Sequence, residues 1–115
     1  MSKITKTQIL APCLGKAQSL TGLVEFADDS VVSKTLLDKP AGTLTLFAFA
    51  AGQGLSEHTS PYDATVHVLE GKARVVIDGE GIEVSAGELI VMPANVAHSL
   101  AAQERFKMLL IMIRN

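Results

Sequence analysis

Short runs of β-branched and aliphatic residues recur along this chain, separated by glycine, proline and aspartate. The runs lie at 31–37, 43–50, 64–71, 72–78, 82–84, 89–92 and 106–113. Such runs are typical of strands, and the residues between them are typical of turns. We therefore expect an all-β domain of about eight to ten strands, folded as a sandwich or barrel.

The run at 43–50 is apolar on both of its faces. Leu44, Leu46, Ala48 and Ala50 share one face, and Thr43, Thr45, Phe47 and Phe49 share the other. Because side chains alternate along a strand, this pattern predicts burial on two sides. We interpret one side as the barrel interior and the other as a contact with a second subunit.

Two shorter features refine this expectation. Asp78-Gly79 lies between two strand-like runs and predicts a tight hairpin turn. Residues 14–26 are ambiguous, because Gly15 and Gly22 weaken any helix placed there.

Length, hydropathy and charge limit the classes of function. With 115 residues, 48% of them hydrophobic, and a mean hydropathy of +0.32, the chain suits one domain, 1–115, with apolar surface hidden in an oligomer. The longest apolar run, 109–113, is too short to span a bilayer, so we expect no membrane insertion. A net charge of −2 without a basic patch gives no support for nucleic-acid binding. Cys13 is the single cysteine, and we expect a cytoplasmic protein.

Two segments carry the motifs of interest, "GQGLSEHTSPYDATVHVLEG" at 52–71 and "GELIVMPANVAHSL" at 87–100. In this order, 15 residues apart and within an all-β pattern, they resemble the two signature motifs of the cupin superfamily, in its compact bacterial, RmlC-like form. The matching positions are Gly52, His58 and Gly71 in the first segment and Gly87, Pro93 and His98 in the second.

The resemblance implies a double-stranded β-helix, or jelly-roll barrel. It places the barrel core at about 43–113 and an N-terminal strand or arm at about 1–30. It also implies a homodimer, since small cupins pair through sheet faces and swapped N-terminal strands.

The resemblance further implies a metal site of three histidines and one carboxylate. His58 and His98 match two of the histidines, whereas Ser60 stands for the third and Ala64 for the glutamate. In the second motif, Asn95 replaces a glycine and Ala102 an asparagine. A transition metal normally takes at least three protein ligands. We therefore expect zinc, nickel, iron or manganese to be held weakly or not at all.

No neighbouring residue restores the lost ligands convincingly. His67 and Asp63 alternate with Ala64 and should face away from it, and Glu57 should face away from His58. Tyr62 is two residues after Ser60 and four after His58, so strand alternation should turn all three side chains inward. The predicted ligand pocket comprises His58, Ser60, Tyr62, Ala64, Met92 and His98.

Several functions stay open at this point. The first is a small-molecule-binding module with apolar walls and a few polar groups. The second is a metal-dependent enzyme of dioxygenase, isomerase or decarboxylase type with a two-histidine centre, or a metal-free variant using one histidine as acid or base. The two histidines could also be structural remnants, or the chain a sensing domain that acts with another protein.

Overall fold

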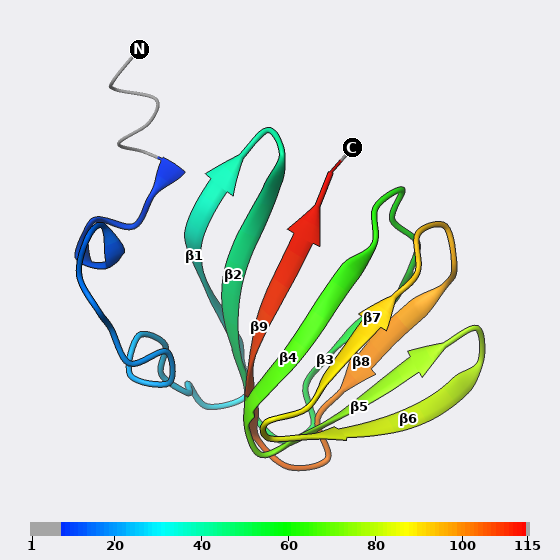
Figure 1. Cartoon of the computed structure of the whole chain (residues 1–115). Coiled ribbons are helices and arrows are strands. Elements are labelled where there is room, and N and C mark those ends of the chain that lie inside the picture. Colours follow the sequence, from blue (N-terminus) through cyan, green and yellow to red (C-terminus); the bar gives the residue numbers. More distant parts are fainter. Residues whose placement is uncertain (1–7, 115) are drawn as a thin grey trace.

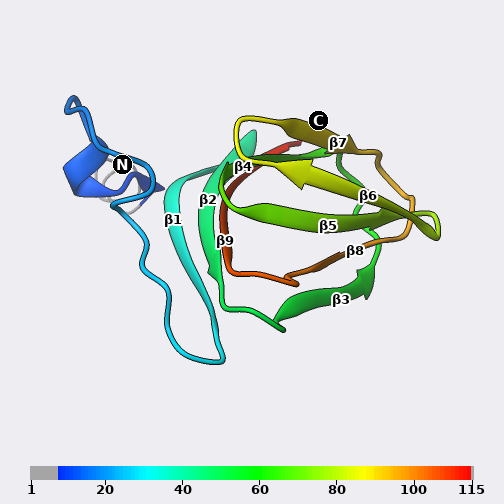
Figure 2. The same ribbon diagram turned by 90° about the horizontal axis from the view of Figure 1, so that it is seen from below.

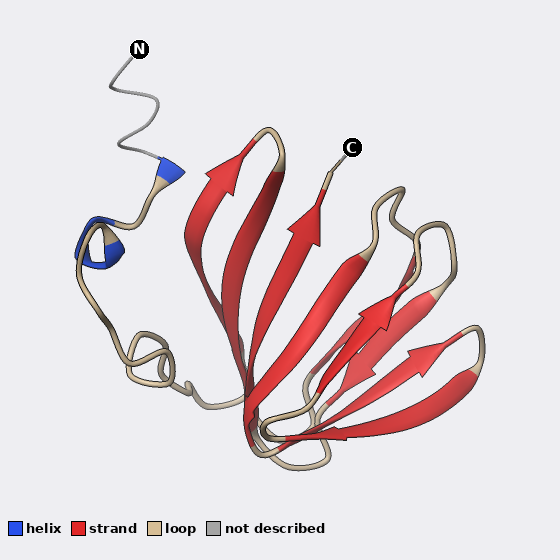
Figure 3. Cartoon of the chain, viewed as in Figure 1, coloured by secondary structure: helices blue, strands red, loops and turns tan. Residues whose placement is uncertain are grey.

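The computed structural model describes residues 8–114, where nine strands and one 3₁₀ turn occur (Figures 1 and 3). The turn, η1, is Ala11–Cys13. The strands are β1 Val31–Lys39, β2 Gly42–Phe49, β3 Gly54–His58, β4 Ala64–Glu70, β5 Lys72–Ile77, β6 Glu80–Ser85, β7 Leu89–Met92, β8 His98–Ala101 and β9 Phe106–Ile113.

The strands form two antiparallel sheets that face each other (Figure 2). Sheet A has the order β1-β2-β9-β4-β7, and sheet B has the order β3-β8-β5-β6. Every pairing is antiparallel, and β9 returns from the end of the chain to lie between β2 and β4. The predicted all-β jelly-roll class is confirmed.

The two sheets converge at one end of the barrel and splay apart at the other (Figure 1). At the narrow end, the loop at 50–53 and the residues before β9 are joined by Gly52 N–H to Ala102 O and Ala102 N–H to Gln53 O. The wide end carries the β3–β4 loop at 59–63 and the β7–β8 loop at 93–97, which lie side by side. The motif histidines sit at the wide end.

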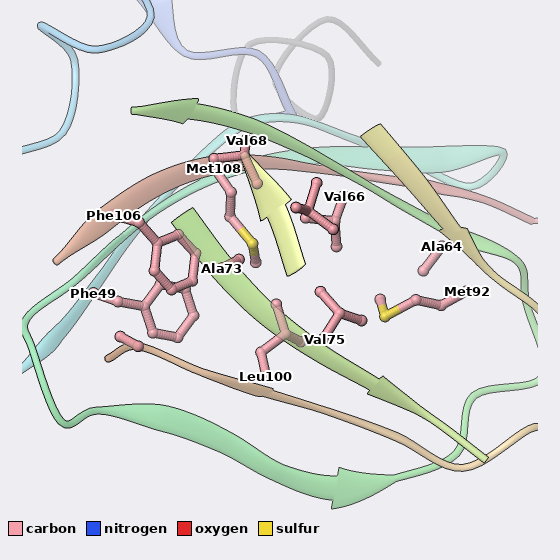
Figure 4. Packing of buried hydrophobic residues seen from close by; sticks show 12 residues of the cluster. Phe49, Ala64, Val66, Val68, Ala73, Val75, Met92, Leu100, Phe106 and Met108 are labelled. Carbon is pink, nitrogen blue, oxygen red and sulfur yellow. The ribbon is translucent and has the colours of Figure 1, made fainter. Parts of the chain in front are cut away.

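The interior between the sheets is apolar along most of its length (Figure 4). At the narrow end the rings of Phe49 and Phe106 stack with their centroids 4.5 Å apart. Ala64 and Met92 lie at the opposite end of this core (Figure 4). The buried members are Phe49, Ala64, Val66, Val68, Ala73, Val75, Val84, Met92, Leu100, Ala102, Phe106 and Met108.

A second apolar cluster lies on the outer face of sheet A, under residues 8–30, which we call the N-terminal arm. Val24 of the arm packs with the fully buried Leu46 and Ala48 of β2. Lys107 is also buried here, where its ammonium donates to Thr21 O at 2.7 Å and lies 4.9 Å from the Phe26 ring centroid. The interpretation of this face of β2 as a subunit contact is therefore wrong for Leu46 and Ala48, because the chain's own arm covers them.

Turn geometry agrees with the sequence at the β5–β6 hairpin. Asp78 and Gly79 have φ values of 51° and 78°, which is the left-handed backbone that an Asp-Gly hairpin turn requires. At the motif residue Gly71, φ is 77°, and a Cβ would lie 2.5 Å from Arg105 O. Only glycine suits that position without a backbone shift.

Candidate functional site: a histidine pair at the wide end

His58 ends β3 and His98 begins β8, and their Cα atoms are direct partners across the antiparallel pair. Leu100, two residues after His98, belongs to the interior core, so alternation turns His98 inward as well. His98 is 3% exposed, whereas His58 is exposed at the rim. Residues forty positions apart in the chain are thereby brought together at the end of the barrel interior.

A β-bulge aims His58 at its partner. Leu55 pairs with Leu100 and His58 pairs with His98. Two residues therefore separate the paired positions on β3, whereas one residue separates them on β8. In a regular strand Leu55 and His58 would point to opposite faces. The extra residue at 56–57 reverses the parity, which lets both side chains face inward.

Backbone carbonyls fix the tautomers of both imidazoles. Nδ1 of His58 lies 2.7 Å from Ser56 O, and Nδ1 of His98 lies 3.0 Å from Val96 O. A carbonyl oxygen only accepts hydrogen bonds, so each Nδ1 carries the N–H and donates it. In the neutral rings both Nε2 atoms then carry free lone pairs.

These two lone pairs converge on one spot. The Nε2 atoms are 3.2 Å apart, and the rings meet edge to face at 72°. Two imidazole nitrogens bound to one tetrahedral metal at about 2.0–2.1 Å would be separated by roughly 3.3 Å. The observed spacing therefore suits two acceptors that share a proton, a hydrogen-bond donor or a cation.

The remaining donors do not complete a tight metal centre. Ala64 has only a methyl group, and the Ser60 hydroxyl accepts a hydrogen bond from Tyr62 N–H at 3.2 Å. No group of three or more His, Cys, Asp or Glu side chains is placed to hold a metal within residues 8–114. The residues thus fit two ligands of a metal ion but not the three or four that hold one firmly.

Two contacts brace the loops on either side of the histidine pair. Asp63 accepts a hydrogen bond from Ala94 N–H at 2.8 Å, and Asn95 N–H donates to Ser60 O at 2.7 Å. Asn95 has a φ of 63°, a conformation that asparagine tolerates better than most residues, which explains how it replaces the motif glycine. Asp63 is therefore a bracing residue between loops.

The other predicted pocket residues line different parts of the wide end. Ala64 and Met92 are buried and are Cα partners on β4 and β7, on the interior face of sheet A. The Tyr62 ring lies near Arg114, whose guanidinium carbon is 5.9 Å from the ring centroid.

His67 lies on the other face of its strand. Ala64, Val66 and Val68 are buried in the interior, and His67 alternates with them on an unshifted stretch of β4. Its Cα partners are Leu89 on β7 and Leu109 on β9. His67 thus belongs to the outer face of sheet A, away from His58 and His98.

Reasoning from the sequence missed three features of this site: the bulge, the tautomer-fixing carbonyls of Ser56 and Val96, and Ile77. Ile77 is the Cα partner of His98 on β5 and supplies an apolar neighbour. No sequence signal predicts the bulge or the carbonyls. The register that places Ile77 could have been counted back from the Asp78-Gly79 turn.

Comparison with known proteins places this geometry in a family. The family model described as the cupin domain matches residues 45–113, more than half of the chain. The chain belongs to the cupin family. Comparison with the curated proteins gives no significant match.

Several solved structures resemble the chain closely. A conserved protein of unknown function from Streptococcus pyogenes is 39% identical with a TM-score of 0.83, covering 87% of this chain and 88% of its own. A cupin superfamily protein from Desulfitobacterium hafniense is 30% identical with a TM-score of 0.80, covering 84% and 88%. A Cupin 2 conserved barrel domain protein from Leptotrichia buccalis is 40% identical with a TM-score of 0.79; the match covers 82% of this chain but 46% of that one.

No helix within residues 8–114 is long and apolar enough to cross a membrane.

Proposed function

We propose that this cupin binds a small molecule at the wide end of its barrel, with His58 and His98 as the polar centre of the site. The observation that carries the proposal is the 3.2 Å separation of their Nε2 atoms, with both tautomers fixed by carbonyls. Two acceptors aimed at one spot, at the same end of the barrel as the buried apolar Ala64 and Met92, have the composition of a ligand site. Ser60 and Tyr62 complete the proposed pocket.

A metal-dependent enzyme of dioxygenase, isomerase or decarboxylase type is the second candidate. The spacing of the two Nε2 atoms favours it, because it matches the separation of two ligands on one metal ion. Ser60 and Ala64 count against it, since neither offers a strong third ligand. Under this candidate zinc, nickel, iron or manganese would be held by the two histidines and completed by water or substrate.

Elemental analysis of the protein purified without added metal separates the two candidates. We expect far less than one transition metal ion per chain. About one ion per chain, lost in His58→Ala/His98→Ala, would instead favour the metalloenzyme. His67→Ala is the matched control, because it removes the remaining histidine from the outer face and should change nothing.

The wider setting of the proposal follows from composition and family. We expect one cupin domain over residues 1–115, a cytoplasmic location and a homodimer, with neither nucleic acid nor membrane as a partner. The exposed apolar side chains of Leu89 and Val91 on the outer face of sheet A support the homodimer.

A further inference from the structure

At the wide end, the interior face of sheet A carries a row of side chains that Cα pairing connects across all five strands. The row is Asp38 on β1, Thr43 on β2, Met112 on β9, Ala64 on β4 and Met92 on β7. Ala64 and Met92 are buried members of the interior core, and Met112 packs against that core. The row therefore forms the sheet A wall of the wide end, and Asp38 is its charged member.

Arg114 lies directly beyond this row, beside Tyr62. Its backbone N–H donates to Ala41 O at 2.7 Å, so the pairing of β9 with the β1–β2 hairpin continues past Ile113. Because side chains alternate along an extended chain, Arg114 shares the interior side with Met112, two residues earlier. Its guanidinium carbon is 5.9 Å from the Tyr62 ring centroid, within the range of a cation–π contact.

Two contacts with β1 hold the Arg114 guanidinium on this interior side. Nη1 donates to Lys39 O at 2.8 Å and lies 3.8 Å from Oδ1 of Asp38, which belongs to the interior row. A guanidinium has five N–H donors arranged as a planar fork, the shape that matches a carboxylate. Among the described residues, Lys39 O is the acceptor that this side chain reaches. Most of the fork is thus available to a ligand.

The nearby carboxylates leave much of the charge on Arg114 unbalanced. The Asp38 side chain is 60% exposed and 3.8 Å away, and an exposed ion pair of this kind contributes only about 0–1 kcal/mol. The Asp63 carboxylate, next to Tyr62, accepts a hydrogen bond from Ala94 N–H. One partly offset positive charge suits a singly charged carboxylate better than a doubly charged phosphate.

We propose that Arg114 determines specificity, by binding the carboxylate of a small molecule whose other end donates a hydrogen bond to His58 and His98. The inference rests on the proposed function and names the class of ligand, a monocarboxylate with a distal hydrogen-bond donor. The histidine pair lies on sheet B and presents acceptors, whereas Arg114 lies on sheet A and presents donors. Because packed sheets lie about 10 Å apart, an extended molecule is needed to contact both walls.

NMR titration with straight-chain ω-hydroxy carboxylates, from glycolate to ω-hydroxyoctanoate, tests the assignment against the matching ω-hydroxy primary amides. We expect at least one acid to bind the wild type with a dissociation constant at least tenfold lower than that of its amide. Arg114→Gln should abolish this preference. Arg114→Lys keeps the charge without the fork and should retain part of it.

Lys39→Gln is the matched control for the loss of a neighbouring cation. The Lys39 side chain lines a groove with Leu44 and Ile111, on the outer face of sheet A, and its backbone carbonyl stays in place for Arg114. The preference for the acid should therefore equal that of the wild type. Circular dichroism checks that all the variants are folded.

His98→Ala separates this inference from the proposed function. It should weaken acid and amide by the same factor and leave the preference for the acid intact. Equal binding of acid and amide, or a preference that survives in Arg114→Gln, would overturn the role of Arg114 while the histidine site stands. Affinities that His98→Ala leaves unchanged would overturn the histidine site while Arg114 keeps its role. No binding of any acid at millimolar concentration would overturn the ligand class.

Discussion

Two pairs of rings lie across neighbouring strands at opposite ends of the barrel. At the narrow end Phe49 and Phe106 are Cα partners on β2 and β9, stacked at 12° with centroids 4.5 Å apart. At the wide end His58 and His98 are Cα partners on β3 and β8, set edge to face at 72° with centroids 4.4 Å apart. The same direct cross-strand pairing thus stabilises the fold at one end and presents free acceptor atoms at the other.

The Phe49–Phe106 pair at the narrow end should contribute more to the free energy of unfolding than the His58–His98 pair. Phe106→Ala removes a fully buried ring and leaves a cavity beside Phe49. We expect the free energy of unfolding to fall by about 3–5 kcal/mol, measured by urea denaturation. His58→Ala, at the exposed rim, should change it by only about 0.5 kcal/mol. Equal losses at the two ends would contradict the contrast between them.

The residue spacing at the bulge, 56–57, should determine whether the His58–His98 pair forms. Inserting one alanine between Glu57 and His58 adds a position that the bulge does not absorb and turns the His58 side chain away from His98. We expect ligand binding to fall to the level of His98→Ala, measured by native mass spectrometry. Glu57→Ala keeps the bulge and should bind like the wild type. Unimpaired binding after the insertion would show that the spacing between Leu55 and His58 does not aim His58 at His98.

Adding a third imidazole at the wide end should strengthen metal binding there. Ser60→His places a histidine where the family has one, so the affinity for Zn²⁺ should rise at least tenfold, about 1.4 kcal/mol, by isothermal titration calorimetry. The same substitution in a His98→Ala background serves as the control and should gain much less. No gain in the Ser60→His single variant would mean that residue 60 does not face the pair.

The smallest expected effect concerns the loop that braces the site. Asn95 has a φ of 63°, so Asn95→Ala should lower the free energy of unfolding by about 1 kcal/mol. Asn95→Gly should stay within about 0.5 kcal/mol of the wild type, because glycine accepts this backbone freely. Thermal unfolding of the two variants side by side measures the difference, and identical values would refute the conformational explanation.

Local patterns predicted most of the fold. The alternation in 43–50 and 64–71 and the turn at Asp78-Gly79 correspond to β2, β4 and the β5–β6 hairpin. β3 gave no such signal, because GLSEH is polar and mostly exposed and forms a strand only by pairing with β8.

Long-range packing could not be predicted from the sequence. Residues 14–26 were ambiguous, and nothing local shows that this segment covers Leu46 and Ala48 or that the Lys107 ammonium would be buried against Thr21. At the site, motif spacing suggested that His58 and His98 are partners. The carbonyls that orient them and the bulge that aims His58 depend on tertiary structure.

Native mass spectrometry of the protein purified without added metal tests the central claim most directly, because one spectrum reports both bound metal and bound organic molecules. We predict no stoichiometric metal, together with an organic adduct that is present in the wild type and in His67→Ala but absent in His98→Ala. One transition metal ion per chain, or an adduct that persists unchanged in His98→Ala, would contradict a small-molecule site centred on the histidine pair.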